Sequence, residues 1–398
     1  MGLVEEIVSV REFVDAIAKG EMVPDELLVD RKTGLVRQAG TVDSSDSKFI
    51  LNFRKAAEQS LYVFAKAVLG LDRLTHHLHL PICQLLTRIP PYRKLVLLPR
   101  DHLKSSIVAK ALPIHILIQP KEHNIYIPKL DGASTRILLS NETATNAEHF
   151  LRWVMAKFET CKLLRALWPH RCWDNPRRES KKWQEKEMMI PRDEDFPEAS
   201  IETIGVGGAI TSRHYSVLIK DDLISIEAAN SPVVMQTAVE WHKASRALMD
   251  DPDKSLEFII GTRWAVYDLY EFIEQEDPSV EVYKRAGVED GVSIWPEMFS
   301  LETHARLRKE FGTLYPLLYL NSATDPALTD FDLEQIRVFR VEGDKIAFDE
   351  TEQDLLLHKE YSGPVKTPDL PRGTVVTRDM WGQLMGRGKE AYLRLKYG

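Results

Sequence analysis

The chain has 398 residues, of which 44% are hydrophobic and 28% are charged, and its formal net charge is -8. This composition is typical of a folded protein with a sizeable core, and the acidic excess argues against a chain that coats nucleic acid over its whole surface. Apolar runs long enough to span a membrane are absent, and the 3 cysteines lack zinc-site spacing, so we expect an intracellular protein with reduced thiols.

The first 50 residues predict a helical arm and a linker. Residues 1–20 carry a helical pattern that ends at Gly20, whereas residues 21–48 are polar and acidic without periodicity. From Phe53 to Leu86 the apolar residues recur at helical spacing, and Gly70-Leu71-Asp72 is predicted to separate two helices.

The segment from Lys94 to Ser106 predicts a buried strand, a phosphate-binding loop and the start of a helix. Leu95 to Leu98 form a short apolar run of the kind buried in parallel sheets. The loop then places Lys104 and Ser105 at a helix N-terminus, where backbone N–H groups favour anions. This arrangement is typical of an NTPase.

The predicted loop contains no glycine, although the usual phosphate-binding loop has glycine six residues before the lysine and again directly before it. Leu98 and Leu103 occupy these positions. Leucine before the lysine predicts a different backbone turn or a weaker hold on the phosphate. Asp101 should repel a triphosphate unless it points away or pairs with Arg100 or His102.

A second strand, loop and helix are predicted from Ile137-Leu138-Leu139 through Leu164. Residues 161–190 then combine tryptophans with many lysines and arginines. Aromatic side chains among cations suit a nucleic-acid face, but they equally suit an amphipathic surface segment whose tryptophans pack on the core. Both interpretations remain open from the sequence.

Three further strand signals complete the predicted sheet. Residues 188–190 and 201–204 alternate like a hairpin and lead into a glycine-rich turn at 205–208, and two apolar strands follow at 215–219 and 256–260. Both apolar strands end in polar clusters, as ligand-facing strand ends do in open α/β sheets.

Two adjacent carboxylates, Asp221 and Asp222, follow the strand at 215–219. Phosphoryl transfer needs one carboxylate near Mg²⁺ and another group that orients the attacking water. We assign Asp221 to the metal together with Ser105, and Asp222 to the water. The alternative is that the two aspartates cap the next helix.

These segments resemble the large terminase subunits of tailed bacteriophages, which are ATP-driven DNA-packaging motors. Residues 98–106 resemble a variant Walker A motif, residues 207–222 a glycine-rich approach to Walker B, and residues 259–264 the coupling motif. Two later pieces, at 295–297 and 315–321, resemble the end of the ATPase region. Each piece alone is weak, whereas their order and spacing together are specific.

The resemblance implies that ATP and Mg²⁺ are the cofactors and assigns roles to the matching residues. Lys104 would contact the β and γ phosphates, Arg100 would sense the γ phosphate, and Thr262 would couple hydrolysis to movement. Arg100 could instead form a salt bridge, and Thr262 could cap a helix. The implied nucleotide-binding loop consists of Pro99, Arg100, Asp101, His102, Leu103, Lys104, Ser105 and Ser106.

Two assignments rest on weaker signals. The family binds adenine through a segment upstream of Walker A, which corresponds to residues 75–84 and singles out His79 and Gln84. Ring motors usually take an arginine from a neighbouring subunit, and Arg213 is the candidate because it precedes the Walker B strand. Its alternative role is an ion pair with Asp222 or Glu227.

The family's second activity, an RNase H-like nuclease, is not expected from this chain. We predict an N-terminal helix and linker over 1–50, an ATPase domain over 51–325 and a C-terminal extension over 326–398 that is too short for a complete nuclease domain. A hairpin is predicted from 336–340 and 345–348, and the acidic residues at 349–354 are interpreted as a solvated loop.

The predicted fold is α/β, an ASCE-type P-loop NTPase with a central, mostly parallel sheet flanked by helices. The resemblance implies a motor that moves double-stranded DNA into a procapsid from the bacterial cytoplasm, as a ring of five subunits on the portal protein, fed by a small terminase subunit and without a membrane partner. A nucleotide-binding assembly subunit with little turnover and a helicase-like ATPase are the alternatives.

Overall fold

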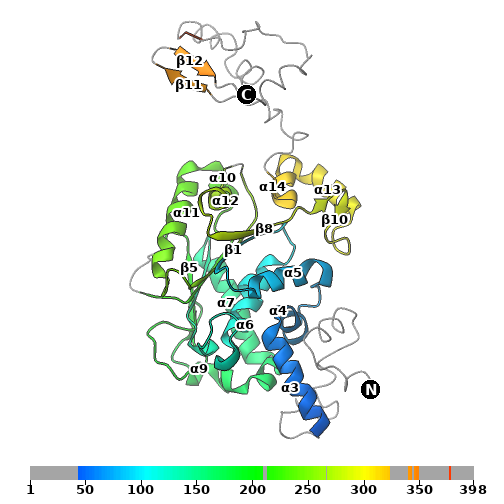
Figure 1. The fold of residues 1–398 in the computed structure, drawn as a ribbon, viewed down its shortest axis with the longest axis vertical. Coiled ribbons are helices and arrows are strands. Elements are labelled where there is room, and N and C mark those ends of the chain that lie inside the picture. The colour runs from blue at the N-terminus through cyan, green and yellow to red at the C-terminus, as the bar shows by residue number, and fades with distance from the viewer. Residues whose placement is uncertain are drawn as a thin grey trace.

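A computed structural model of the chain (Figure 1) describes residues 44–208, 213–265 and 267–322, together with strands at 339–342, 345–348 and 376–377. The predicted helix over 1–20 lies outside these residues, as do most of the predicted linker and the acidic segment 349–354. The first described helix begins at Ser44, within the predicted linker.

The helices alternate with strands along most of the described chain. The α-helices are α3 (Ser44–Gln59), α4 (Leu61–Val63), α5 (His76–Thr87), α6 (Leu112–Leu117), α7 (Ala144–Thr160), α8 (Lys162–Leu167), α9 (Pro176–Glu179), α10 (Ile226–Asn230), α11 (Pro232–Ser245), α12 (Leu269–Glu276), α13 (Leu301–Phe311) and α14 (Tyr315–Leu320). The π-helical turns are η1 (Phe64–Val68) and η2 (Ser106–Ala111), and the 3₁₀ turns are η3 (Lys121–His123), η4 (Gly132–Ser134), η5 (Pro169–Arg171), η6 (Arg246–Leu248) and η7 (Gly312–Leu314).

The described strands form one large sheet and two small ones. They are β1 (Arg93–Leu97), β2 (Ile137–Asn141), β3 (Trp183–Gln184), β4 (Glu187–Met188), β5 (Ile201–Gly205), β6 (Val217–Asp221), β7 (Leu256–Gly261), β8 (Val280–Lys284), β9 (Val288–Glu289), β10 (Val292–Ser293), β11 (Phe339–Glu342), β12 (Lys345–Phe348) and β13 (Val376–Thr377). The antiparallel pair of β11 and β12 confirms the predicted C-terminal hairpin, with the first strand at 339–342 where 336–340 was predicted.

The large sheet has 8 strands in the order β3-β4-β5-β2-β6-β7-β1-β8. The strands from β5 to β8 in this order are parallel, and the short strands β3 and β4 add an antiparallel edge. One additional strand, β7, separates β1, which leads into the Lys104 loop, from β6, which ends at Asp221. This order confirms the predicted ASCE-type P-loop NTPase fold with a mostly parallel sheet.

The sheet is buried on both faces because alternate strand residues pack into different cores. On β1, Val96 belongs to the core shared with α3 to α8, whereas Leu95 and Leu97 pack with α10, α11 and α12. Figure 1 shows these two helical layers on opposite sides of the sheet. Parallel strands covered on both faces need continuous apolar sequence, which explains why β1 was predictable from Leu95 to Leu98.

Three elements show where the observed structure agrees with the sequence pattern and where it adds to it. Helix α5, the second of the two helices predicted between Phe53 and Leu86, begins at His76 and contains Pro81 in its interior. The predicted hairpin over 188–190 and 201–204 forms as the antiparallel pair of β4 and β5, with Met188 opposite Ile201. Strand β8 gave no clear signal, because it lies at the sheet edge with a partly exposed, mixed sequence.

A cluster of buried charges lies between β6, β7 and α11, on the face opposite Asp221. Lys220 Nζ lies 2.5 Å from Glu257 Oε1, and Arg246 Nη2 lies 2.8 Å from Glu257 Oε2. Burial alone would raise the pKa of Glu257, but Lys220, His242 and Arg246 lower it to about 2. Both carboxylate oxygens therefore have cationic partners, which is the condition for burying an ion pair without a large penalty.

Candidate active site

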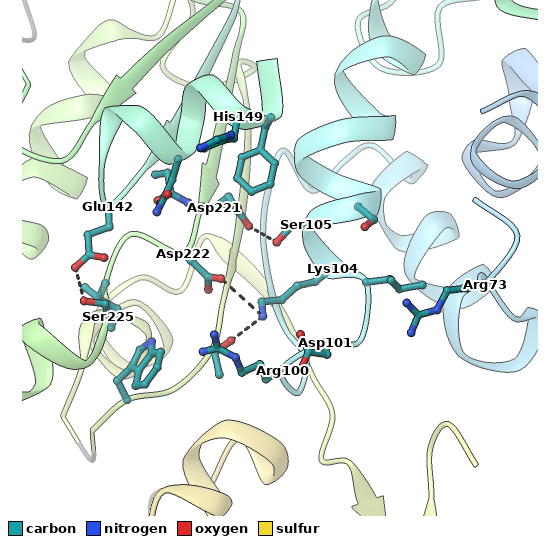
Figure 2. Close-up of a pocket in the computed structure, with 18 of the residues that line it drawn as sticks. Arg73, Arg100, Asp101, Lys104, Ser105, Glu142, His149, Asp221, Asp222 and Ser225 are labelled. Atoms are coloured by element: carbon teal, nitrogen blue, oxygen red, sulfur yellow. Dashed lines mark hydrogen bonds and ion pairs between the residues drawn. The ribbon is translucent and has the colours of Figure 1, made fainter. Parts of the chain in front are cut away.

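A cavity of about 690 Å³ opens at the carboxyl edge of the sheet (Figure 2), where four strand ends meet. The Lys104 loop after β1 forms its floor, and segments after β2, β6 and β7 complete its wall. Lining residues from these strand ends are Arg100, Asp101, Leu103, Lys104, Ser105, Ser106, Asn141, Glu142, Asp221, Asp222, Thr262 and Trp264. Its size is typical of a small-molecule site.

Lys104 is 5% exposed, and its side chain reaches the carboxyl ends of β6 and β7. Its Nζ donates to Thr262 Oγ1 at 2.6 Å and lies 3.9 Å from Asp222 Oδ2, and Figure 2 shows both interactions as dashed lines. An ammonium group has three donors. A nearly buried cation that faces a cavity with a hydroxyl and one distant carboxylate as partners is suited to bind an anion.

Asp221 ends β6 and contacts the loop through Ser105. The Ser105 hydroxyl donates to Asp221 Oδ1 at 2.8 Å, and Asn141 Nδ2 lies 3.4 Å from Asp221 Oδ2. Burial, together with the charge of Asp222, raises the pKa of Asp221 to about 7. A bound cation would remove this penalty, so the carboxylate is suited to a metal.

The donor set fits Mg²⁺. Magnesium prefers oxygen ligands and usually keeps several waters beside one or two carboxylates and substrate phosphates. The hydroxyl of Ser105 and the carboxylate of Asp221 are such ligands. Within the described residues no group of three or more His, Cys, Asp and Glu side chains could hold a metal by itself.

The Lys104 loop keeps a glycine-like backbone without glycine. Asp101 and Leu103 have φ values of 64° and 59°, both in the left-handed region. Each such residue costs roughly 1–2 kcal/mol, and it persists only where the surrounding contacts offset that cost. The Arg100 N–H donates to the Leu318 carbonyl at 2.8 Å, and the Leu103 side chain packs against the large core. Leu103 therefore adopts the turn that glycine normally supplies.

A tyrosine beneath the sheet edge positions β6 and β7. A Cβ atom on Gly261 would lie 2.0 Å from the Tyr270 ring, so only glycine allows this ring to pack against the end of β7. The Tyr270 hydroxyl also accepts a hydrogen bond from the Leu223 N–H at 3.2 Å. One buried ring thus holds the chain directly after Asp222 and directly before Thr262.

The capping alternatives for the site residues are wrong. The N-cap of α10 is Ser225, whose hydroxyl accepts from the Glu227 N–H, so Asp221 and Asp222 do not cap this helix. The N-cap of α12 is Asp268, which leaves Thr262 as the partner of Lys104. Asp221, Asp222 and Thr262 are therefore not used as caps of these helices, and all three line the cavity.

Arg100 lies at the cavity mouth. Its guanidinium carbon is 5.9 Å from the centre of the Trp264 ring, which is a cation–π contact, and no described carboxylate forms the salt bridge that we considered. Both side chains line the cavity. Arg100 is exposed, which leaves it able to approach a bound anion.

Several predicted residues are not brought to the cavity. Pro99 and His102 belong to the loop but not to the lining, and the His102 ring stacks on Phe299 with centroids 4.6 Å apart. His79 is fully buried against Trp295, and Gln84 is exposed on α5. Neither His79 nor Gln84 lines the cavity, so this geometry does not support their assignment to adenine.

Arg213 also lies away from the cavity. It precedes the amino end of β6, whereas the cavity is at the carboxyl end, and it pairs with Glu202 on β5. The proposed alternative partners, Asp222 and Glu227, are therefore wrong. A role in the site of a neighbouring subunit stays a prediction, because a single chain does not test it.

Sequence reasoning missed part of the lining. Asn141 and Glu142 come shortly after the predicted strand at 137–139, and Asn141 is the last residue of β2. The rule that parallel strand ends meet at one edge could therefore have identified them. Arg73 and Phe299 also line the cavity but follow no strand of the sheet, and no local motif marks them. Asn146, His149, Phe150, Ile224 and Ser225 complete the lining.

The tryptophans of the basic segment pack on the protein. Trp168 is fully buried, and the indole of Trp173 donates to the Met189 carbonyl at 2.8 Å. Arg171 is buried and pairs with Asp131 at 2.7 Å. These contacts favour the amphipathic packing interpretation over a stacking surface for nucleic acid.

The chain was compared with protein families, curated proteins and solved structures. No protein-family model matches the chain, and no curated protein matches it. Among solved structures, the HK97 bacteriophage large terminase is similar, with a TM-score of 0.37 and 10% sequence identity over 85% of this chain and 66% of that chain. The chain thus spans less than two thirds of that structure's length, and at this level the likeness carries no argument about function.

Proposed function

We propose that this chain is the ATP-hydrolysing motor subunit of a viral terminase, which moves double-stranded DNA into a procapsid. The observation that carries the ATPase assignment is the convergence of Lys104, Ser105, Asp221, Asp222 and Thr262 on one cavity. Phosphoryl transfer uses these residue types at the ends of these strands. The motor assignment rests in addition on the motif resemblance of the sequence.

Binding of ATP would use the floor of the cavity. Lys104 supplies a nearly buried positive charge for the β and γ phosphates, and it can leave Thr262 for a phosphate oxygen because a lysine side chain is flexible. Ser105 and Asp221 would hold Mg²⁺. The metal supplies charge neutralisation at the phosphates when it is bound.

Hydrolysis would use the polar groups at the ends of β6 and β7. Asp222 would orient the attacking water. This role is supported by its carboxylate, which is partly exposed, lines the cavity and lies close to Lys104. When ATP binds, the Thr262 hydroxyl would lose its hydrogen bond from Lys104 and donate to the γ phosphate instead. Loss of this phosphate would then change the hydrogen bonding at the end of β7. Such an exchange of partners can drive a movement.

Assembly supplies the remaining parts of the proposed motor. We expect a ring of five subunits on a portal protein in the bacterial cytoplasm, with a small terminase subunit as a further partner. Arg213, on the opposite edge of the sheet from its own cavity, could act only on a neighbouring subunit's nucleotide. Contacts to DNA would be to the backbone, because a motor must translocate any sequence.

Steady-state ATP hydrolysis by the purified chain tests the proposal. We expect Mg²⁺-dependent turnover that duplex DNA stimulates, and that Lys104→Ala and Asp222→Asn abolish. Lys121→Ala is the matched control, because Lys121 is an exposed lysine outside the cavity. Stimulation by single strands but not by duplex would favour a helicase-like ATPase.

A nucleotide-binding assembly subunit is the second candidate, and the carboxylate of Asp101 at the cavity favours it. A carboxylate beside a triphosphate weakens binding, and two left-handed residues make the loop costly to hold. ATP binding without turnover, even with DNA and portal protein present, would support this candidate and contradict the motor.

A further inference from the structure

We infer that Glu142 is a second carboxylate that acts on the attacking water, beside Asp222. This inference rests on the proposed ATPase function and assigns one more catalytic residue to the same site. Glu142 follows β2 directly, so it stands at the carboxyl edge of the sheet on the strand next to β6. It lines the cavity and is half-buried.

The backbone fixes Glu142 beside Asp222. The Glu142 N–H donates to the Asp222 carbonyl at 3.1 Å, and the Glu142 carbonyl accepts from the Val206 N–H at 3.2 Å. Adjacent strands lie about 4.8 Å apart, and both acidic residues line the same cavity. A glutamate side chain is one methylene longer than aspartate, which extends its reach into the cavity.

The partners of the two carboxylates differ. Asp222 faces Lys104, so its charge is engaged by the same ammonium group that would bind the phosphates. Among the described residues, Glu142 has no cation in its ion-pairing range, and its Oε1 accepts a hydrogen bond from the Ser225 hydroxyl. Figure 2 shows Glu142 and Ser225 joined at one side of the cavity. This hydrogen bond positions the carboxylate and leaves Oε2 for a water.

The chemical step balances without a further reactant. The water oxygen forms a bond to the γ phosphorus while the bond from this phosphorus to the bridging oxygen breaks, and ADP leaves with the electron pair. The water proton passes to the Glu142 carboxylate and then to the product phosphate. A positioned carboxylate that accepts a proton typically contributes about 10²–10⁴-fold to the rate.

The test compares Glu142→Gln with Glu227→Gln. Glu227 is an exposed glutamate on α10 close to Ser225 but outside the cavity lining, so it controls for loss of a nearby charge. We expect Glu142→Gln to lower kcat by about 100-fold or more and to leave ATP affinity within about threefold, a factor below 1 kcal/mol. Glu227→Gln should leave both unchanged. The inference is overturned by near-normal turnover in Glu142→Gln, or by an equal loss of ATP affinity and turnover.

A binding measurement keeps the test independent of turnover. ADP with aluminium fluoride imitates the transferring phosphoryl group, and groups that act in the transition state contribute more to such analogues than to ATP. Glu142→Gln should weaken analogue binding more than ATP binding, and equal weakening overturns the inference. If wild-type protein binds neither nucleotide, the proposed ATPase function fails, whereas a normal wild type with an unaffected Glu142→Gln contradicts the role of Glu142 alone.

Discussion

Lys220 and Asp221 are neighbours on β6, yet they face opposite layers of the protein and meet opposite electrostatic conditions. Lys220 is paired with Glu257, whose other oxygen is paired with Arg246. Asp221 has a hydroxyl and an amide as its hydrogen-bond partners and a second carboxylate beside it. The charge of Lys220 is compensated within the fold, whereas burial and a neighbouring carboxylate disfavour the charge of Asp221. The first pattern is typical of a structural ion pair, and the second is typical of functional sites, which supports the proposed metal-binding role of Asp221.

The largest expected effect concerns the stability that the buried Lys220–Glu257 pair provides. Lys220→Ala should lower the free energy of unfolding by about 3 kcal/mol or more, because it leaves Glu257 buried with one cation fewer. Lys104→Ala should change it by less than about 1 kcal/mol, because Lys104 faces a cavity and not a closed ion pair. Urea unfolding of both variants measures the difference, and equal destabilisation would contradict the comparison.

The next effect is a pH dependence of the free energy of unfolding that arises from Asp221. The folded protein raises the pKa of Asp221 from 3.8 to about 7. Between these pH values the folded state retains a proton that the unfolded state has lost, so the contribution of Asp221 to the free energy of unfolding falls as pH rises from about 4 to about 7. Without Mg²⁺, Asp221→Asn should therefore be more stable than wild type at pH 8, by about 1–3 kcal/mol.

Unfolding titrations at pH 4.5 and pH 8 in the presence of a chelator measure this dependence. The advantage of Asp221→Asn should nearly vanish at the lower pH. Glu257→Gln should show the opposite effect at pH 8. The pKa of Glu257 is lowered, so its ionisation stabilises the fold above about pH 4.5, and the variant should be less stable than wild type. An Asp221→Asn variant that is less stable than wild type at pH 8 would refute the assignment.

A smaller effect concerns the metal. Ser105→Ala should reduce the gain in ATP affinity that Mg²⁺ provides by about tenfold, because one of the two predicted protein ligands is lost. Affinity without Mg²⁺ should change little, which serves as the internal control. Calorimetric titration of ATP with and without the metal measures both values, and an unchanged metal dependence would remove Ser105 from the metal site.

The smallest effect is expected at Asp101. Asn tolerates the left-handed conformation and removes a negative charge from the cavity. Asp101→Asn should therefore improve ATP affinity by about 2–5-fold at low salt, and the gain should shrink as salt screens the charge. Binding titrations at two ionic strengths test this, and a loss of affinity would show that Asp101 helps to hold the ligand.

The sequence predicted the central sheet and the polar residues at its carboxyl edge, because apolar runs mark the strands and the polar residues come where each run ends. Buried parallel strands carry continuous apolar runs, so β1, β2, β6 and β7 could be recognised. Their polar ends could be assigned to one edge, which is why Lys104, Ser105, Asp221, Asp222 and Thr262 were predicted together. The left-handed turn at Leu103 was not predictable, because leucine rarely adopts it and only the surrounding contacts hold it there.

The remaining residues depend on contacts that no local pattern reveals. Arg73 and Phe299 reach the cavity from segments far apart in the sequence. His79 lies where the motif resemblance suggested a nucleotide contact, but its ring is buried against Trp295. Burial among apolar neighbours also lowers the pKa of His79 to about 4. Such positions follow from tertiary packing, which the sequence specifies only through the whole fold.

Equilibrium binding of ATP, measured by calorimetry with Mg²⁺ present, tests the central claim most directly. The account predicts about one site per chain, a loss of affinity of about 30-fold or more in Lys104→Ala, and wild-type affinity in Lys121→Ala. A wild type that does not bind ATP, or a Lys104→Ala variant that binds as tightly as wild type, would contradict the assignment of this cavity to a nucleotide.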